Sequence, residues 1–188
     1  MILYIHGFGS SGHGHKALIL RERMKEPGFL APTLHSVPEL AVSTLCDFVE
    51  AFRKHESIWL IGSSLGGYYA MHLAEKYDLP AVLINPAIRP YELLHRALGH
   101  PNNYYDLSTY EWRETHLQML KRFEVSDPDP TRYMLLLQKG DEVLDYREAL
   151  SKLPRTRTIL EEGGDHGFVG IERHVPTMLE FFDSFQKR

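Results

Sequence analysis

Residues 57–69, S-I-W-L-I-G-S-S-L-G-G-Y-Y, decide how the rest of this chain is organised. The stretch begins with a short apolar run at residues 58–61, which is typical of a buried strand. A helix pattern follows at residues 68–76, and Ser64 stands between the two. A serine on a sharp turn from a strand into a helix has its hydroxyl exposed at the end of the strand, an arrangement known as a nucleophile elbow.

Two glycines make so tight a turn possible. Gly62 and Gly66 lie two residues on either side of Ser64, in the spacing G-x-S-x-G. Side chains at these two positions would collide with the neighbouring backbone. Ser63 does not fit, because isoleucine and leucine stand where it would need glycines. The stretch therefore predicts Ser64 as a nucleophile; the alternative is a glycine-rich turn whose serine has no chemical role.

The composition is that of an ordinary globular domain. The chain has 188 residues, 43 % of them hydrophobic and 24 % charged, and its net charge is −4. This length predicts one domain, spanning residues 1–188. No basic stripe stands out along the sequence, so we do not expect nucleic acid as a partner.

The single cysteine and the apolar runs bear on the expected location. Cys46 cannot form a disulfide within the chain, and we expect it to be a small buried residue on a helix rather than a nucleophile. The first strand is expected to begin at Ile2, which leaves no room for a signal peptide. No apolar run approaches the length of a membrane span. The expected compartment is the cytoplasm.

Short apolar runs alternate with helix patterns along the chain. The runs that predict strands lie at residues 2–5, 31–35, 58–61, 80–84, 133–137 and 156–160, the second being the weakest. Helices are predicted at residues 15–25, after Pro38, and at 68–76, 146–152 and 175–185. Such alternation predicts an α/β fold, a compact parallel sheet of about six strands with helices on both faces.

Two helix details are specific enough to test. Pro27 and Gly28 are expected to end the helix that begins at residue 15. The apolar side of the helix after Pro38 is expected to comprise Leu40, Leu45, Phe48, Val49 and Phe52.

One region departs from the alternation. Residues 87–130 contain many aromatic residues and leucines but no convincing strand, which predicts two or three inserted helices. The insertion leaves from the end of a strand, the side on which open α/β sheets bind ligands. We therefore expect a small helical cap over the site, with Tyr105 and Trp112 as candidate substrate contacts. The alternative is that these aromatic residues only pack the insertion against the sheet.

A serine hydroxyl needs a base to take its proton and a third group to orient that base. His166, in the loop G-G-D-H-G after the last predicted strand, is the expected base. It follows the serine and a later acid, the chain order of α/β-hydrolases. His174 also follows them but lies at the entry to the last helix, where a structural role is expected.

The acid is expected after the preceding strand. Asp141 directly follows Gly140 there, so one helix and one strand separate it from His166. Asp145 and Glu142 are the competitors, and Asp145 is expected to cap the helix that begins near residue 146.

An acyl-transfer site also needs amide donors where negative charge develops on the substrate oxygen. The backbone N–H of Leu65, directly after the nucleophile, is one predicted donor. The second is expected at Phe8, whose flanking glycines let the backbone approach the substrate. His6, in the same loop, is expected to be a hydrogen-bonded loop residue rather than an acid or base.

Neither a metal nor a cofactor is expected. His13 and His15 lie two residues apart beside glycines, but no third ligand is placed near them in the sequence. An exposed glycine-rich loop is the better interpretation of these histidines.

Several motifs together resemble a known family. The segments H-G-F-G-S-S, I-G-S-S-L-G-G-Y-Y-A, I-N-P-A-I-R-P-Y-E-L-L, L-L-Q-K-G-D-E-V-L-D-Y-R and E-G-G-D-H-G-F are similar to those of the YqiA-like esterases, a branch of the α/β-hydrolase superfamily. The resemblance covers nearly the whole chain. It implies esterase activity on carboxylic esters or thioesters, with Ser64, Asp141 and His166 as the triad. It also implies a sheet with the strand order 2-1-3-4-5-6.

The resemblance leaves the substrate open. Arg89, in N-P-A-I-R-P, is a candidate for binding an anionic group, and a salt bridge at the hinge of the insertion is the alternative. The expected function is a serine hydrolase that acts on a small acyl ester or thioester through an acyl-enzyme. The alternatives are a C–C bond hydrolase or acyltransferase on the same template, and a non-catalytic ligand-binding protein of this fold. The oligomeric state is not predicted.

Overall fold

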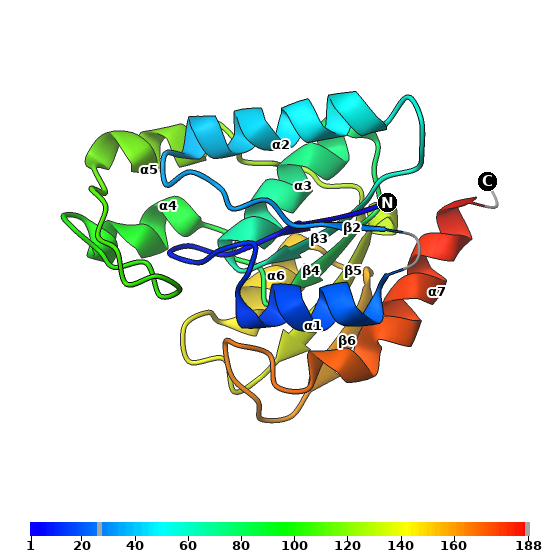
Figure 1. Cartoon of the computed structure of the whole chain (residues 1–188). Helices are drawn as coiled ribbons and strands as arrows, with labels where there is room; N and C mark the ends of the chain where they lie inside the picture. Colours follow the sequence, from blue (N-terminus) through cyan, green and yellow to red (C-terminus); the bar gives the residue numbers. More distant parts are fainter. Residues whose placement is uncertain (26–27, 187–188) are drawn as a thin grey trace.

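A sheet of six parallel strands forms the centre of the computed structural model, which describes residues 1–25 and 28–186 (Figure 1). The strand order is β2-β1-β3-β4-β5-β6, as the family resemblance implies. The predicted parallel α/β fold is confirmed. The strands are β1 (Ile2–Ile5), β2 (Phe29–Leu30), β3 (Trp59–Ser63), β4 (Ala81–Ile84), β5 (Tyr133–Gln138) and β6 (Arg157–Glu161).

Helices cover both faces of the sheet, because successive residues of a strand point to opposite sides. In β1, Leu3 and Ile5 join one buried cluster, whereas Ile2 and Tyr4 join the other. Helices α2 and α3 lie on the first side and α1 and α7 on the second (Figure 1). The helices are α1 (His15–Arg23), α2 (Pro38–Phe52), α3 (Leu65–Tyr77), α4 (Pro90–Leu93), α5 (Glu114–Lys121), α6 (Tyr146–Lys152) and α7 (Val175–Gln186).

The second strand lies earlier than the sequence predicts. Strand β2 consists of Phe29 and Leu30, which pair with β1, and the prediction of a strand at residues 31–35 is wrong. Pro32 has no N–H to contribute to a ladder. Beyond it, the Thr33 hydroxyl accepts a hydrogen bond from the N–H of Gly12 at 3.2 Å. This segment therefore runs along the loop after β1 instead of extending the sheet.

The helix details are partly corrected. Helix α3 begins at Leu65, directly after the elbow serine, rather than at residue 68. Helix α2 buries Pro38, Ala41, Val42, Leu45 and Val49, whereas Leu40 is 50 % exposed and does not belong to the apolar side. Helix α1 ends at Arg23. Pro27, expected to help end it, lies outside the described residues.

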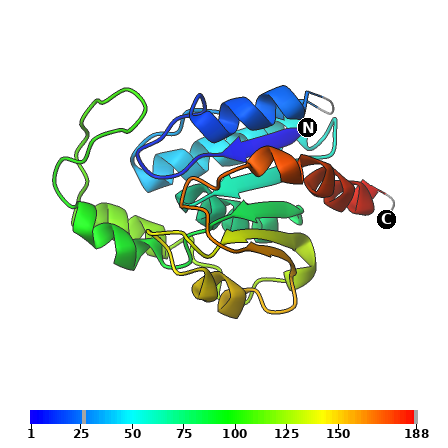
Figure 2. The same ribbon diagram turned by 90° about the horizontal axis from the view of Figure 1, so that it is seen from below.

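The insertion is only partly helical. It contains α4, the 3₁₀ turn Leu94–Ala97, α5 and the 3₁₀ turn Pro130–Arg132. Between the second and third of these, two isolated antiparallel bridges, Gly99 with Trp112 and Asn102 with Thr109, form a hairpin-like loop. Figure 2 shows this green loop projecting beyond the ends of the strands. The division into one domain with a cap stays a prediction.

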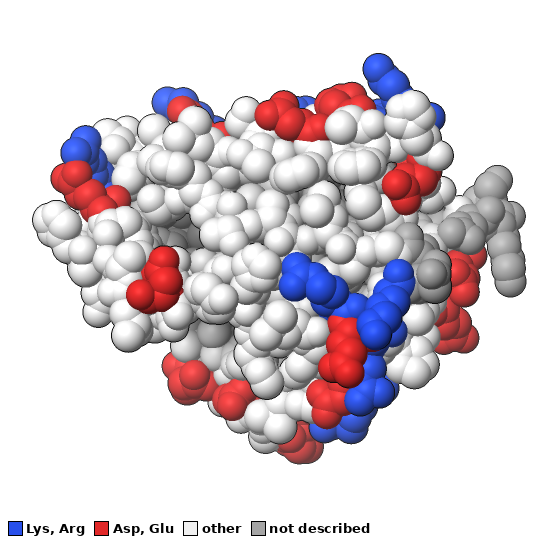
Figure 3. Space-filling model, viewed as in Figure 1, with Lys and Arg blue, Asp and Glu red and all other residues white. Residues whose placement is uncertain are grey.

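The molecular surface carries charge in small groups. On the face drawn in Figure 3, basic and acidic side chains lie next to one another at the lower right, and broad areas are uncharged. Within residues 1–25 and 28–186, no helix is both long enough and apolar enough to cross a membrane.

Candidate active site

Ser64 occupies a strained turn between β3 and α3. Its φ is 56° and its ψ is −122°, a conformation that costs free energy in a residue other than glycine. Backbone hydrogen bonds hold it there. Its N–H donates to the carbonyl of Ile84 at 3.1 Å, and its own carbonyl accepts from the N–H groups of Gly67 at 2.9 Å and Ala87 at 3.0 Å. The end of β4 therefore fixes the elbow.

The flanking glycines are needed for the reason that the sequence suggests. A β-carbon at Gly62 would overlap the carbonyl oxygen of Gly66, and one at Gly66 would overlap the carbonyl oxygen of Ile5. Both clashes are with backbone, which has no rotamer by which to move away. The predicted collisions are confirmed, and they specify this turn.

Three side chains that the sequence separates widely meet at the ends of β3, β5 and β6. His166 Nε2 lies 3.0 Å from Ser64 Oγ. His166 Nδ1 lies 2.9 Å and 3.0 Å from the two carboxylate oxygens of Asp141. An ionised carboxylate only accepts hydrogen bonds, so Nδ1 carries the proton and Nε2 is free to accept from the serine hydroxyl. This arrangement can activate a hydroxyl for attack.

Asp141 is buried and held as an anion. Its side chain is 2 % exposed. One oxygen also accepts hydrogen bonds from the backbone N–H groups of Val143 at 2.8 Å and Leu144 at 2.9 Å. Burial raises the pKa of Asp141, but the hydrogen bonds from His166, Leu144 and Val143 outweigh it, and the pKa lies below its ordinary value. The carboxylate is therefore ionised at neutral pH.

The competing acids have other contacts. Asp145 caps α6 by accepting a hydrogen bond from the N–H of Arg147 at 3.0 Å, as predicted. Glu142 accepts a hydrogen bond from the backbone N–H of His166 at 3.0 Å, which the sequence does not suggest. His174 lies 2.9 Å from a carboxylate oxygen of Glu161, consistent with its expected structural role.

Two buried amides that the sequence analysis missed fix the loop that carries His166. The Asn85 side chain donates to the carbonyls of Asp165 at 3.0 Å and His166 at 3.4 Å, and accepts from the N–H of Gln138 at 3.0 Å. The Gln138 side chain accepts from the N–H groups of Asp165 at 3.1 Å and Val169 at 3.0 Å. The only sequence signal is that an amide residue directly follows β4 and another is the last residue of β5.

The predicted oxyanion donors lie at the start of α3 and in the loop after β1, both beside Ser64. Leu65 is the first residue of α3, so its N–H has no partner within the helix. Phe8 lies in the loop after β1 and lines the same cavity as Ser64. Among the described residues, neither N–H donates to a backbone carbonyl or a side chain. Both groups are therefore available to a ligand.

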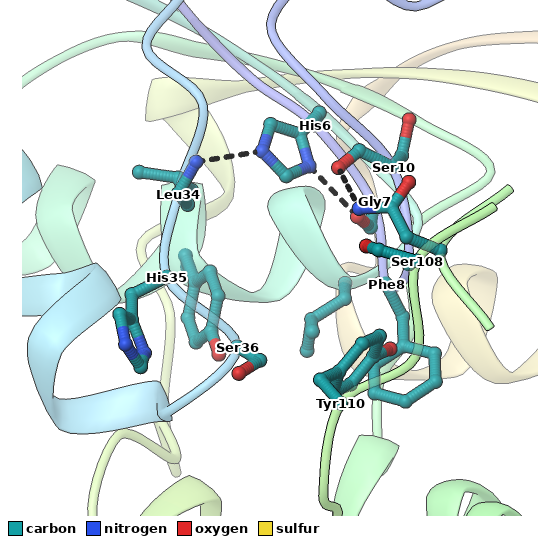
Figure 4. Close-up of a pocket in the computed structure, with 13 residues that line it drawn as sticks. His6, Gly7, Phe8, Ser10, Leu34, His35, Ser36, Ser108 and Tyr110 are labelled. Carbon is teal, nitrogen blue, oxygen red and sulfur yellow. Dashed lines mark hydrogen bonds between the residues drawn. The ribbon is translucent and has the colours of Figure 1, made fainter. Parts of the chain in front are cut away.

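His6 supports the loop that carries Phe8. Its Nδ1 lies 2.8 Å from the carbonyl oxygen of Gly7, and its Nε2 accepts from the N–H of Leu34 at 2.9 Å (Figure 4). These partners require a neutral ring with the proton on Nδ1. Burial lowers the pKa of His6, against a smaller opposing effect of the Gly7 carbonyl. His6 is thus a hydrogen-bonded loop residue, as expected.

A cavity of about 350 Å³ opens onto Ser64 and His166. Tyr104 and Lys16 also line it. The Lys16 ammonium donates to the carbonyl of Gly167 at 2.9 Å, which attaches α1 to the loop that carries His166. Burial lowers the pKa of Lys16, although Asp165 and Asp141 favour its charged form.

The three candidate substrate contacts lie elsewhere. Trp112 is 1 % exposed, packs edge-on against Phe8 at 4.9 Å between ring centroids, and donates to the carbonyl of Leu94. Tyr105 is 55 % exposed near the tip of the hairpin-like loop. Arg89 forms ion pairs with Glu92 and Glu148. None of the three lines the cavity around Ser64, and their contact with substrate stays a prediction.

The glycine-rich loop shows no metal-binding arrangement. His15 and Lys16 begin and continue α1, and the His13 ring lies 6.4 Å from that of Tyr105. Among the described residues, no group of three or more His, Cys, Asp or Glu side chains could hold a metal ion.

Comparisons with known proteins agree with this architecture. A model of the uncharacterised protein family UPF0227 matches residues 1–183, which confirms the family resemblance. The UPF0227 protein YcfP of Salmonella paratyphi B is 26 % identical over 186 residues, covering 96 % of this chain and 98 % of the relative.

Solved structures share the fold. Alpha/beta hydrolase domain-containing protein 10 from mouse superposes with a TM-score of 0.75 at 18 % identity, covering 98 % of this chain and 90 % of that one. Est1E from Butyrivibrio proteoclasticus, in its complex with ferulic acid, gives a TM-score of 0.73 at 13 % identity, covering 99 % and 88 %. At these identities the likeness shows an α/β-hydrolase fold.

Proposed function

Because the chain belongs to the uncharacterised protein family UPF0227 and has the α/β-hydrolase fold, we propose that it is a serine hydrolase of carboxylic esters or thioesters. The observation that carries the proposal is the continuous chain of hydrogen-bonding distances from Ser64 Oγ through His166 to Asp141. A serine on a strained elbow, a base within 3.0 Å and a buried acid behind that base are the parts that nucleophilic catalysis by a hydroxyl requires.

In this proposal His166 Nε2 takes the proton as Ser64 Oγ attacks the acyl carbon. The negative charge that develops on the acyl oxygen is stabilised by the N–H groups of Phe8 and Leu65. His166 then gives its proton to the leaving alcohol or thiol, and the acyl-enzyme remains. In the second half of the reaction, water attacks the acyl-enzyme with His166 again as the base, and His166 then returns the proton to Ser64 Oγ. Asp141 keeps the ring in the required tautomer and stabilises its cationic form.

The strain at Ser64 supports the proposal over a structural role. A serine without a chemical role gains nothing from a positive φ, and glycine would occupy the position at lower cost. Several contacts maintain that conformation, including the backbone hydrogen bonds from β4 and two glycines with no room for a side chain. Strain that the surroundings enforce is characteristic of functional sites.

Hydrolysis assays test the proposal. Purified protein should hydrolyse some p-nitrophenyl esters or acyl thioesters in a panel of chain lengths, and Ser64→Ala should reduce this rate by at least about 10³-fold. Asn102→Ala, at an exposed position on the hairpin-like loop, is the matched control. Equal turnover by wild type and Ser64→Ala would reject the proposal. The panel should also contain acyl acceptors other than water, because an acyltransferase would use the same residues.

The proposal includes a small-molecule substrate and the cytoplasmic location expected from the sequence. A cavity of about 350 Å³ accommodates a small leaving group rather than a polymer. Cell fractionation tests the location.

A further inference from the structure

A second cavity, of about 190 Å³, adjoins the proposed site. It shares Gly7, Phe8 and Ser10 with the cavity around Ser64, and Leu65 and Tyr69 of α3 also line it. Figure 4 shows the two facing walls of this cavity. The segment before α2 forms one wall, and the other is formed by the hairpin-like loop and by the loop after β1 that carries Phe8, called the oxyanion loop below. The labelled residues of these walls are Leu34, His35 and Ser36 on the first, and Phe8, Ser108 and Tyr110 on the second.

The positions of the catalytic groups determine which part of a substrate each cavity receives. In the tetrahedral intermediate, four groups surround the reacting carbon: Ser64 Oγ, the leaving group, the acyl chain, and the oxygen that accepts hydrogen bonds from the Phe8 and Leu65 amides. His166 must reach the leaving group to protonate it, so the leaving group occupies the cavity that His166 lines. The second cavity is lined by both oxyanion residues but not by His166, and it therefore receives the acyl chain.

The second cavity is not an apolar pocket. Tyr69 is 3 % exposed, and its hydroxyl makes no hydrogen bond with any described residue although the ring is surrounded by protein. The Tyr110 hydroxyl is buried and also lacks a partner among the described residues. Ser36, on the opposite wall, makes no side-chain hydrogen bond with the described part of the chain. An unpaired hydroxyl on a tyrosine as buried as Tyr69 is rare in proteins and calls for a specific explanation.

Tyr68, the neighbour of Tyr69, shows the usual arrangement. Its buried hydroxyl donates to the carbonyl of Leu120 at 2.7 Å. Of these two adjacent tyrosines on one helix, the hydroxyl of Tyr68 is therefore paired within the protein, whereas that of Tyr69, which lines the cavity, is not.

We infer that the second cavity binds a short acyl group that carries an uncharged hydroxyl or keto oxygen, which the Tyr69 hydroxyl recognises. No Lys, Arg, Asp or Glu is among the residues that line this cavity, and of its two histidines His6 is held as a neutral ring, so the lining favours an uncharged acyl group. A cavity of about 190 Å³ suits a short acyl group rather than a long chain. This inference rests on the proposed function, because it assigns the acyl side of the same reaction.

A matched pair of esters tests the inference. The substrates are p-nitrophenyl butyrate and p-nitrophenyl 3-hydroxybutyrate, which differ by one hydroxyl. Wild type should favour the hydroxylated ester in kcat/KM, and Tyr69→Phe should lower this preference by about threefold to tenfold, the usual effect of one neutral hydrogen bond.

Tyr68→Phe is the control, because its hydroxyl is paired and does not line the cavity. It should lower the melting temperature and leave the preference between the two esters unchanged, whereas Tyr69→Phe should change the preference without lowering the melting temperature. Wild type that hydrolyses both esters equally, or Tyr69→Phe that retains the full preference, would overturn the inference and leave the proposed function standing. Hydrolysis of no ester in the wider panel would overturn both.

Discussion

Replacing Asn85 by alanine should disturb the proposed site without touching any of its reacting groups. Asn85 is 3 % exposed and connects the end of β4 to β5 and to the loop that carries His166. Its φ is 39°, in the left-handed region that asparagine tolerates better than alanine does. The substitution removes the connections and adds backbone strain.

The cost can be estimated from these contacts. Loss of the Asn85 oxygen leaves the buried N–H of Gln138 without its partner, which lowers the free energy of unfolding by about 1–3 kcal/mol. The left-handed backbone adds about 1 kcal/mol for alanine. The free energy of unfolding should therefore fall by about 2–4 kcal/mol, which leaves a domain of ordinary stability folded. For a domain of this size, the melting temperature should fall by roughly 4–16 °C.

Activity should fall by more than the loss of folded protein explains. The Asn85 side chain donates to the carbonyls of Asp165 and His166, so its loss lets the His166 ring drift from Ser64. A displacement approaching 1 Å lowers kcat by about 100-fold, and the remaining contacts of Gln138 should limit the loss to about tenfold to 100-fold.

Urea unfolding and steady-state hydrolysis of p-nitrophenyl acetate measure the two effects. Asn102→Ala, which lacks side-chain hydrogen bonds among the described residues and is exposed, should change neither. Asn85→Asp keeps the acceptor for Gln138 but sets a buried carboxylate oxygen against the carbonyls of Asp165 and His166, so it should lose activity and at least as much stability as Asn85→Ala. If Asn85→Ala retained both wild-type stability and wild-type kcat, the reasoning about how the His166 loop is held would be wrong.

Three further predictions concern the acid, the oxyanion loop and pH. Asp141→Asn should lower kcat by up to about 10⁴-fold in ester hydrolysis, and Asp145→Asn, which only weakens a helix cap, should lower it little; equal losses would leave the acid unassigned. Gly7→Ala would put a β-carbon 3.1 Å from Cβ of Ser64 and should lower kcat severalfold, while circular dichroism should show an unchanged fold. A wild-type kcat in this variant would show that the loop can move to make room for the methyl group. Burial lowers the pKa of His6, so the stability that its neutral ring contributes should be complete above about pH 6.5 and should decline as the pH falls through the lower folded-state pKa. Urea unfolding of wild type and His6→Gln from pH 8 to pH 5 tests this. A difference in free energy of unfolding that stays constant over this range would contradict it.

Much of the architecture is predictable because it depends on local patterns. The apolar runs of β3 to β5 are buried along their whole length, so their sequences stand out without any tertiary information. The elbow is visible as a local pattern because its two glycines stand within one turn, although Gly66 is required by the backbone of the neighbouring strand β1, at the carbonyl of Ile5. The positions of Asp141 and His166 follow from parallel strands, whose carboxyl ends meet at one edge of the sheet.

The parts that sequence reasoning missed depend on contacts between distant segments. Asn85 and Gln138 are 53 residues apart, and nothing in the local sequence shows that their side chains meet under the His166 loop. Strand β2 has only two residues, too few for periodicity to indicate where it begins. Leu40 lies in the first turn of α2, where a shift of the helix start by one residue changes whether a side chain faces the core or the solvent.

The aromatic residues of the insertion show the same limit. Trp112 and Tyr105 are equal candidates by composition, yet one is covered by Phe8 and the other is exposed on the hairpin-like loop. That loop has no helical period, so sequence alone cannot say which face each ring takes. The cavity beside the oxyanion loop is lined instead by Tyr69 and Tyr110.

The most direct test of the account is to locate the residue that becomes covalently modified. Wild-type protein should react with a fluorophosphonate probe, and fragmentation of the labelled peptide by mass spectrometry should place the adduct on Ser64 rather than on its neighbour Ser63. Ser64→Ala should not be labelled, Ser63→Ala should be labelled, and His166→Ala should react far more slowly because its serine lacks a base. An adduct on any other residue, or labelling that survives in Ser64→Ala, would contradict the assignment of Ser64 as the nucleophile.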